Sequence, residues 1–394
     1  MSLSTLPLSY CTNVHPGKNI DQVVQGLREY TIPARRQIGE RIAAGLWLPA
    51  SALAELRQHP DQKTQLRTVL AEGDLVCYTL NTFPFGDFHS DRVKENVYVP
   101  DWTEERRYEY TRDSAELLGE LMPDGVEGSL STVPLGFKGF DHPADFFDRC
   151  CENLIRLAKD LDRLHDETGR VLRLAIEPEP LCLLETTGEA IEFFQRLFSL
   201  ADGRGIGDIV RRHVGLCYDV CHQAVEFEDI EESVRAIDRA GIRINKVHLT
   251  CALHLDKPME NGPAREQLAE YVEQRYLHQT FAKSTDGQVH RFTDLTVAFC
   301  ENPPREFLSA EAWRIHFHVP VHREDVGLLK TTRPELEAVL KAVHRLDYAP
   351  HLEVETYTWG VLPEEERLTL TDGLTRELQA THSLVRDCRS NTER

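Results

Sequence analysis

The sequence predicts a (β/α)8 TIM barrel, of the α/β class, as a single domain over residues 1–394, with an insertion after the seventh strand. Short apolar, strand-like runs alternate with longer amphipathic stretches, which is typical of a parallel sheet covered by helices. About eight such units favour a closed barrel over an open sheet. No GxGxxG or GxxxxGK[ST] motif follows a strand, so the common nucleotide-binding folds lack their usual signature.

Each barrel strand is expected where a short apolar run stands between polar segments. Amphipathic stretches with apolar residues three and four positions apart separate several of these runs and predict helices at 145–167, 189–201, 232–240 and 333–346. The eight expected barrel strands are 7–12, 44–48, 74–81, 125–132, 170–178, 213–219, 244–250 and 351–358.

A ninth strand-like run, 313–320, is one more than a barrel of this kind holds. The segment before it, 252–312, is too long for a loop and reads as polar and poor in strands. We expect this segment to be an insertion after the strand "KVHLT", with "RIHFHVP" where the chain returns from the insertion to the barrel. Loops at the carboxyl ends of barrel strands build active sites, so the insertion is expected to form a wall or lid over the barrel mouth.

Composition narrows the class of partner. The chain has 65 acidic and 45 basic residues, and the resulting net charge of −20 argues against nucleic acid as the main partner. The start of the chain does not resemble a signal peptide, and no apolar stretch approaches the roughly 20 residues that cross a bilayer. The 10 cysteines follow no disulfide pattern. We therefore expect a cytoplasmic protein with reduced thiols, no membrane insertion and a small-molecule metabolite as its partner.

Ionisable residues gather at the ends of the later strands, in "LAIEPEP", "LCYDVCH", "KVHLT", "IHFHVP" and "LEVET". Residues i and i+2 of a strand share a face, so each ExE or HxH pair points to one side, towards the barrel mouth. Mixed imidazole and carboxylate donors suit a divalent ion such as Mn²⁺, Zn²⁺, Mg²⁺ or Co²⁺. The candidate ligands that these strand ends supply are Glu177 and Glu179, Asp219 and His222, His248, His316 and His318, and Glu353 and Glu355.

Each candidate ligand has a simpler explanation when it is taken alone. A glutamate at a strand end is often salt-bridged or solvated, the HxH pair can belong to an exposed face, and Asp219 can cap a helix. Glu185 is best explained as a first-turn charge of the helix that follows it. The conjunction of acidic and histidine residues on successive strands favours the metal site.

The stretches "YCTNVHPG" (10–17), "EPEPLCLLE" (177–185) and "RIHFHVP" (314–320) resemble a known family. The sequence is similar to the xylose isomerase-like TIM barrels of the sugar phosphate isomerase/epimerase superfamily, which also includes zinc-dependent endonucleases of the apurinic-site type. Within it, the chain is most similar to the metabolite traffic protein EboE group. The resemblance covers about Leu8 to Tyr357.

The resemblance implies that Glu177, Asp219, His222, His248 and Glu355 occupy the superfamily's metal positions, with Glu353 as the alternative to Glu355. The multi-metal members carry Asp-x-His where this chain has His316-Phe317-His318, and their two early histidines have no clear match. The resemblance therefore implies one or two ions rather than three.

In the isomerases and epimerases of this superfamily, the metal polarises a carbonyl and stabilises an enediolate. The resemblance implies that Glu177 and Glu355 are catalytic and exchange the substrate proton. It favours a small sugar-like or carbonyl metabolite as substrate. The expected substrate-binding residues are Glu179, Glu353, His15 and Trp359.

Two other functions stay open at this point. A binding or trafficking protein of the EboE type would keep the barrel and its metal without turnover. A metal-dependent phosphodiesterase is less favoured, because the net charge of −20 and the incomplete set of three-metal ligands both argue against it.

Overall fold

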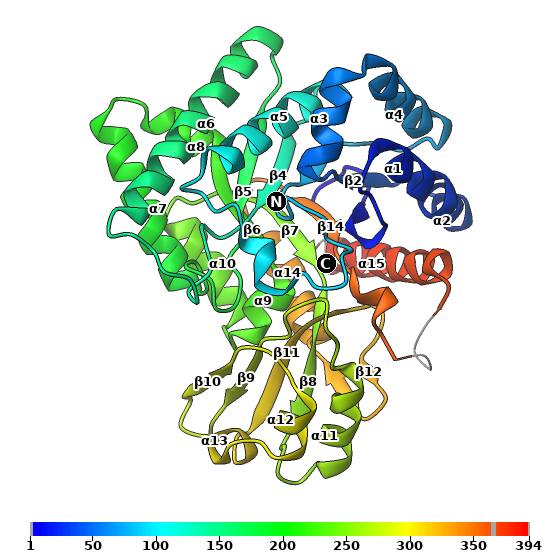
Figure 1. The fold of residues 1–394 in the computed structure, drawn as a ribbon, viewed down its shortest axis with the longest axis vertical. Coiled ribbons are helices and arrows are strands. Elements are labelled where there is room, and N and C mark those ends of the chain that lie inside the picture. The colour runs from blue at the N-terminus through cyan, green and yellow to red at the C-terminus, as the bar shows by residue number, and fades with distance from the viewer. Residues whose placement is uncertain (1–2, 364–367, 393–394) are drawn as a thin grey trace.

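Eight parallel strands close into a barrel in the order β1-β14-β7-β6-β5-β4-β3-β2 in the computed structural model, which describes residues 3–363 and 368–392 (Figure 1). The predicted barrel is therefore confirmed, while residues 1–2, 364–367 and 393–394 of the predicted domain lie outside the described residues. The strands are β1 Ser9–Cys11, β2 Ala43–Trp47, β3 Thr79–Asn81, β4 Gly128–Thr132, β5 Leu172–Ile176, β6 Val214–Asp219, β7 Ile244–Leu249 and β14 His351–Val354.

The predicted strand at 74–81 is shorter in the structure than in the sequence pattern. Only Thr79–Asn81 forms a strand, and Val76 contributes an isolated bridge to Ala43. Asp74 stands at φ 48°, in the left-handed region that ladder residues avoid, so the regular strand cannot begin there.

Helices surround the barrel, and the four predicted ones are present within a few residues of their expected ends. Gly169, at φ 71°, ends α6 in a left-handed conformation, while Thr186 and Glu189 form a reciprocal capping box at the start of α7. The helices around the barrel are α1 Ile20–Gly26, α2 Ile32–Ile38, α3 Ala50–Gln58, α4 Pro60–Glu72, α5 Glu105–Leu121, α6 Phe146–Thr168, α7 Thr187–Gly203, α8 Gly207–His213, α9 Val220–Val225, α10 Ile230–Arg239, α14 Arg333–Val343 and α15 Leu370–Thr392.

The insertion after β7 forms its own six-stranded sheet, in the order β10-β9-β11-β8-β13-β12, and appears as a lobe below the barrel in Figure 1. Its elements are β8 Cys251–Asp256, α11 Gly262–Leu268, β9 Thr280–Lys283, β10 Val289–Phe292, α12 Val297–Glu301, α13 Arg305–Leu308, β11 Ala312–Val319, β12 Asp325–Val326 and β13 Leu329–Thr331.

Two features of the insertion differ from the sequence prediction. The segment 252–312 was expected to be poor in strands, yet it contains most of β8 and all of β9 and β10, and the sheet continues to Thr331. These strands are short: β8 and β9 pair antiparallel with the long strand β11, and β10 pairs antiparallel with β9. Such non-local pairing leaves little trace in local sequence patterns.

Short helical turns occupy several connections. The 3₁₀ turns are η1 Thr12–Val14, η3 Lys94–Tyr98, η4 Ala269–Tyr271 and η5 Thr358–Gly360, and η2 Leu27–Thr31 is a π-helical turn. One continuous apolar core includes residues of the barrel helices and of the insertion sheet. None of the helices in the described part of the chain has the length and apolar character needed to cross a membrane.

Candidate metal centre

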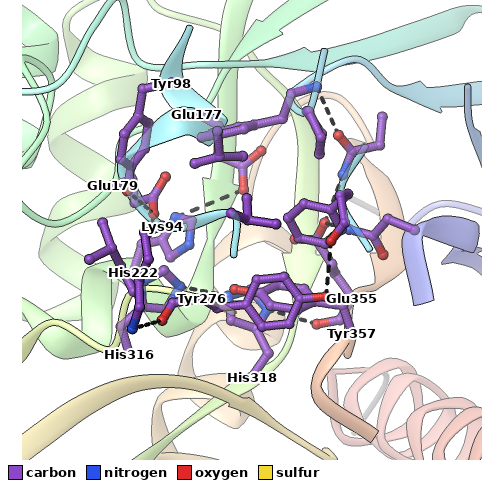
Figure 2. A pocket seen from close by; sticks show the side chains of 18 residues that line it. Lys94, Tyr98, Glu177, Glu179, His222, Tyr276, His316, His318, Glu355 and Tyr357 are labelled. Carbon is purple, nitrogen blue, oxygen red and sulfur yellow. Dashed lines mark hydrogen bonds and ion pairs between the residues drawn. The ribbon is translucent and has the colours of Figure 1, made fainter. Parts of the chain in front are cut away.

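The ends of four neighbouring barrel strands bring the predicted ligands to one place. Asp219, the last residue of β6, is in register with His248 of β7, and His248 is in register with Glu353 of β14. Glu177 follows β5 directly, and Glu355 follows β14. Adjacent parallel strands thereby carry these side chains to the same end of the barrel, as Figure 2 shows for Glu177 and Glu355.

Glu177, Asp219, His248 and Glu355 form the first donor set. One donor atom from each lies within 4.8 Å of the others, and all four residues are buried. His248 Nδ1 is 2.9 Å from Glu177 Oε1, 2.9 Å from Glu355 Oε2 and 3.6 Å from Asp219 Oδ2. Three carboxylates therefore converge on one imidazole nitrogen.

The chemistry of this set fits a divalent cation. Asp219 uses Oδ1 to cap α9 through His222 N at 2.9 Å, so the capping alternative is present, but its Oδ2 has no hydrogen-bond partner. Glu177 Oε2 also lacks a partner. Burial, together with the charges of Glu355 and Asp219, raises the pKa of Glu177 to about 7, although His248 opposes the shift. A bound cation would supply the missing compensation.

Three histidines beside this set, His222, His316 and His318, form a second donor set. His222 and His318 cluster with Asp219, and His222 and His316 cluster with Glu179. His316 Nδ1 hydrogen-bonds Gln279 Oε1 at 2.7 Å and His318 Nδ1 hydrogen-bonds the carbonyl of Glu355 at 2.9 Å. Their Nε2 atoms then face each other at 3.0 Å.

These contacts suit the three imidazoles to metal binding. Burial lowers the pKa of His222, His316 and His318, which favours the neutral form of the rings. His222 is fixed in the same way, with Nδ1 2.9 Å from the carbonyl of Pro178. Neutral imidazoles oriented by the opposite ring nitrogen are the form that metals bind. All three side chains are buried, so the exposed-face alternative for "IHFHVP" does not describe the molecule.

Glu353 lies behind His248 and does not line the pocket. It forms an ion pair with Lys246, accepts a hydrogen bond from Ser9 Oγ at 2.9 Å and is 3.3 Å from His248 Nε2. Gly45 makes room for it, because a side chain there would collide with Glu353 Oε1. Although burial opposes the shift, Lys246 and His248 lower the pKa of Glu353 to about 2. The placement favours Glu355 over Glu353 as the ligand of the last strand.

Two more of the predicted substrate-binding residues are absent from the pocket lining. His15 is buried against Tyr10 and Tyr30, with Nε2 3.1 Å from the Tyr10 hydroxyl. Trp359 packs against Gly373 of α15 and His322. Both lie in the turns that follow barrel strands, where sequence position alone does not tell the packed side of a turn from the open side.

Glu179 does line the pocket, while Glu185 does not. Tyr98 donates a hydrogen bond to Glu179 Oε1 at 2.7 Å, and Gln279 Nε2 donates to the Tyr98 hydroxyl at 3.2 Å. Glu185 forms ion pairs with Lys138 and Arg291, so it joins the rim to strand β10 of the insertion.

Two asparagines at the site were not among the predicted site residues. Asn13 Nδ2 and Asn81 Nδ2 donate hydrogen bonds to Glu355 Oε1 at 2.9 and 2.7 Å. Both line the pocket. Asn13 follows the first strand and Asn81 ends the third, so their positions after apolar runs were the available signal, but asparagine is common in turns.

No family model matches the chain, and no curated protein matches it. A D-tagatose 3-epimerase-like protein is similar in structure, with 11% sequence identity and a TM-score of 0.52, over 98% of this chain and 100% of that one. A xylose isomerase-like TIM barrel protein from Mycobacterium smegmatis, solved in complex with magnesium, has 12% identity and a TM-score of 0.53, over 98% and 99% of the two chains.

At these identities the similarity shows the fold alone. The chain therefore shares the fold of xylose isomerase-like TIM barrel proteins, as the sequence resemblance implied. The narrower resemblance to the EboE group is not tested by these structures and stays a prediction.

Proposed function

We propose that the protein is a divalent-metal-dependent isomerase or epimerase of a small sugar-like or carbonyl metabolite. The observation that carries the proposal is the position of Glu177 and Glu355. Glu177 follows β5 and Glu355 follows β14, the two strands that flank β6 and β7. Each carboxylate lies 2.9 Å from the same nitrogen of His248. Both also line a pocket above the barrel, so two carboxylates are accessible to one bound molecule.

A divalent ion held by Glu177, Asp219, His248 and Glu355 would polarise a substrate carbonyl and stabilise the charge of an enediolate. The two catalytic carboxylates differ in proton affinity. Burial raises the pKa of Glu177 to about 7, while His248 lowers the pKa of Glu355 against the opposing effect of burial. In the metal-free protein, Glu177 is thus suited to hold a proton near neutral pH, and Glu355 to remain a carboxylate.

Asn13 and Asn81 fix the orientation of Glu355 through its Oε1, which leaves Oε2 directed at His248. His222, His316 and His318 would hold a second ion or bind substrate oxygens. We further propose that the insertion acts as a wall of this pocket, since Tyr276, Leu277, His316 and His318 all come from it.

The alternative of a binding protein without turnover keeps the same metal ligands and is separated by experiment. Protein purified without chelator is assayed for bound metal, and then for incorporation of solvent deuterium into hydroxy-ketones and keto acids. Wild type is compared with Glu177→Gln and Glu355→Gln, and the exposed Glu192→Gln serves as the matched control.

We expect bound metal and deuterium exchange in wild type and in the control, and loss of exchange in both site variants. Bound metal without exchange for any substrate would favour the binding protein. Absence of any bound metal would overturn the site itself.

A further inference from the structure

Three aromatic side chains meet above the second donor set, and we call them the aromatic cluster: Phe88, Tyr276 and Tyr357. Their ring centroids are 4.9 Å apart for Phe88 and Tyr276, 5.1 Å for Phe88 and Tyr357, and 4.9 Å for Tyr276 and Tyr357. Tyr357 is also 4.6 Å from the ring of His318. Figure 2 shows Tyr276 and Tyr357 beside the histidines. The cluster therefore borders the donor atoms directly.

The rest of the upper wall is apolar as well. The pocket divides into a polar floor, made by the donor residues and the two asparagines, and a wall made by the β3–α5 loop, the insertion and Tyr357, which follows β14. Besides the aromatic cluster and Tyr98, the wall residues are Phe83, Pro84, Val93, Val97 and Leu277. Tyr98 is stacked on Phe137 at 4.8 Å and hydrogen-bonded to Glu179, so its ring is held in place.

Lys94 supplies the one ammonium or guanidinium group among the described residues that line this pocket. Its Nζ donates to the carbonyl of Tyr276 at 2.7 Å, to the carbonyl of Glu273 at 3.2 Å and to Asp294 Oδ2 at 2.7 Å. A lysine ammonium has three protons, so these three acceptors use all of them. A phosphate bound against the upper wall would find no free cation there, and burying its charge would be costly.

We infer that the substrate carries an uncharged apolar group, preferably a planar ring, next to its metal-chelating oxygens, and no phosphate. This inference rests on the proposed function, because it takes the floor of the pocket as the place where those oxygens bind. Aromatic walls favour a flat apolar group through area burial and ring stacking. An unsubstituted polyol would set most of its hydroxyl groups against the carbon surfaces of this wall, where only the tyrosine hydroxyls can hydrogen-bond.

Three hydroxamates test the inference, since they share one chelating head and differ in the attached group. Acetohydroxamate carries a methyl group, benzohydroxamate a phenyl ring and phosphoglycolohydroxamate a phosphate. Each is titrated calorimetrically into protein loaded with Mn²⁺, and into metal-free protein as a blank. We expect benzohydroxamate to bind at least tenfold more tightly than acetohydroxamate, and phosphoglycolohydroxamate to bind no more tightly than acetohydroxamate.

Phe88→Ala connects any preference to the aromatic cluster. We expect it to weaken benzohydroxamate binding about tenfold and acetohydroxamate binding much less, because a methyl group offers the wall little apolar area. Phe147→Ala, a half-buried phenylalanine of α6 outside the pocket, is the matched control. Val97→Ala, at the partly exposed edge of the pocket, is the second variant should Phe88→Ala not fold.

The possible failures are distinguishable. Equal affinity for the methyl and phenyl compounds, or tighter binding of the phosphate compound, would overturn the inference while the metal site stands. Failure of all three to bind to metal-loaded protein, or failure to load Mn²⁺, would overturn the proposed function together with the inference.

Discussion

The imidazole of His248 lies between two carboxylates that meet its opposite nitrogens. Nδ1 is 2.9 Å from Glu177 on the side of the donor set, and Nε2 is 3.3 Å from Glu353 on the barrel interior. Glu353 is in turn paired with the buried Lys246. A carboxylate behind a ligating histidine fixes its tautomer and makes the free nitrogen a better ligand. We therefore propose Glu353 as a positioning residue of the metal site.

Glu353→Gln tests this role. We expect the affinity for Zn²⁺ to fall about 10- to 100-fold, because the amide cannot supply the negative charge behind His248. Affinity is measured by competition with a chromogenic chelator. Because the single variant leaves Lys246 buried without its partner, the double variant Lys246→Met/Glu353→Gln is the control for folding. Unchanged affinity in a folded variant would contradict the role.

The two asparagines at Glu355 give a second prediction. Asn13→Leu removes one of the two donors to Glu355 Oε1 while keeping a side chain of similar size. A hydrogen bond to a charged group contributes about 1.5–3 kcal/mol, so we expect deuterium exchange to slow by about tenfold or more. Metal content should stay at the wild-type level, since the ligands are untouched. If the variant instead loses metal, and exchange falls only in proportion to the metal lost, then Asn13 supports metal binding and not the exchange step.

The number of ions follows from the two donor sets. We expect protein dialysed against Zn²⁺ to hold two ions per chain, and His316→Asn/His318→Asn to hold one, because the set of Glu177, Asp219, His248 and Glu355 remains complete. Elemental analysis with a protein assay measures both. The buried His351→Asn, on the same strand as Glu353 but outside both donor sets, is the matched control. A single ion in wild type would remove the second donor set as an ion site.

The donor residues of the floor were predictable from sequence, whereas its two asparagines and the upper wall were not. Glu177 follows an apolar strand, Asp219 ends one and His248 is the residue before the last of one, and parallel strands bring such ends together whatever the loops do. The aromatic cluster is different, because Phe88, Tyr276 and Tyr357 come from three loops whose meeting depends on how the insertion sheet packs.

Glu353 illustrates a second limit. It shares a strand face with Glu355, and sequence periodicity cannot tell a ligand from a carboxylate one pleat deeper. The deciding features are the buried Lys246 and the space left by Gly45, which lie on other strands.

Metal binding should depend on pH through Glu177. Its pKa is raised by burial to about 7 in the folded, metal-free protein, whereas an unfolded glutamate titrates near about 4.3. The folded state thus holds this proton more tightly than the unfolded state. The contribution of Glu177 to the free energy of unfolding is therefore fully present below pH ~4.3 and is lost as pH rises towards about 7.

The metal must displace the same proton. We therefore expect this one proton to contribute a rise of about tenfold in Zn²⁺ affinity per pH unit up to about pH 7, and nothing further above it. Chelator competition between pH 5 and 8 measures the slope. In Glu177→Gln the affinity should be lower throughout and the slope reduced by about one proton. An identical slope in wild type and variant would assign the titration to another group.

Lys94 joins the β3–α5 loop to the insertion and gives the last prediction. Its ammonium reaches two carbonyls and Asp294 of the insertion, and its backbone N–H donates to the carbonyl of Arg275 at 2.8 Å. Lys94→Met keeps the backbone bond and the length of the side chain but leaves the two carbonyls without their donor. We expect the free energy of unfolding to fall by about 1–3 kcal/mol, with only a small part from the ion pair because Asp294 is partly exposed. We also expect faster hydrogen exchange over 82–99 and 273–278.

The matched control is Lys63→Met, whose surface ion pair with Glu120 should contribute less than about 1 kcal/mol. Denaturant unfolding and exchange mass spectrometry measure the two effects. Equal losses in both variants, with no local change in exchange, would mean that the loop and the insertion are held together by their apolar contacts rather than by Lys94.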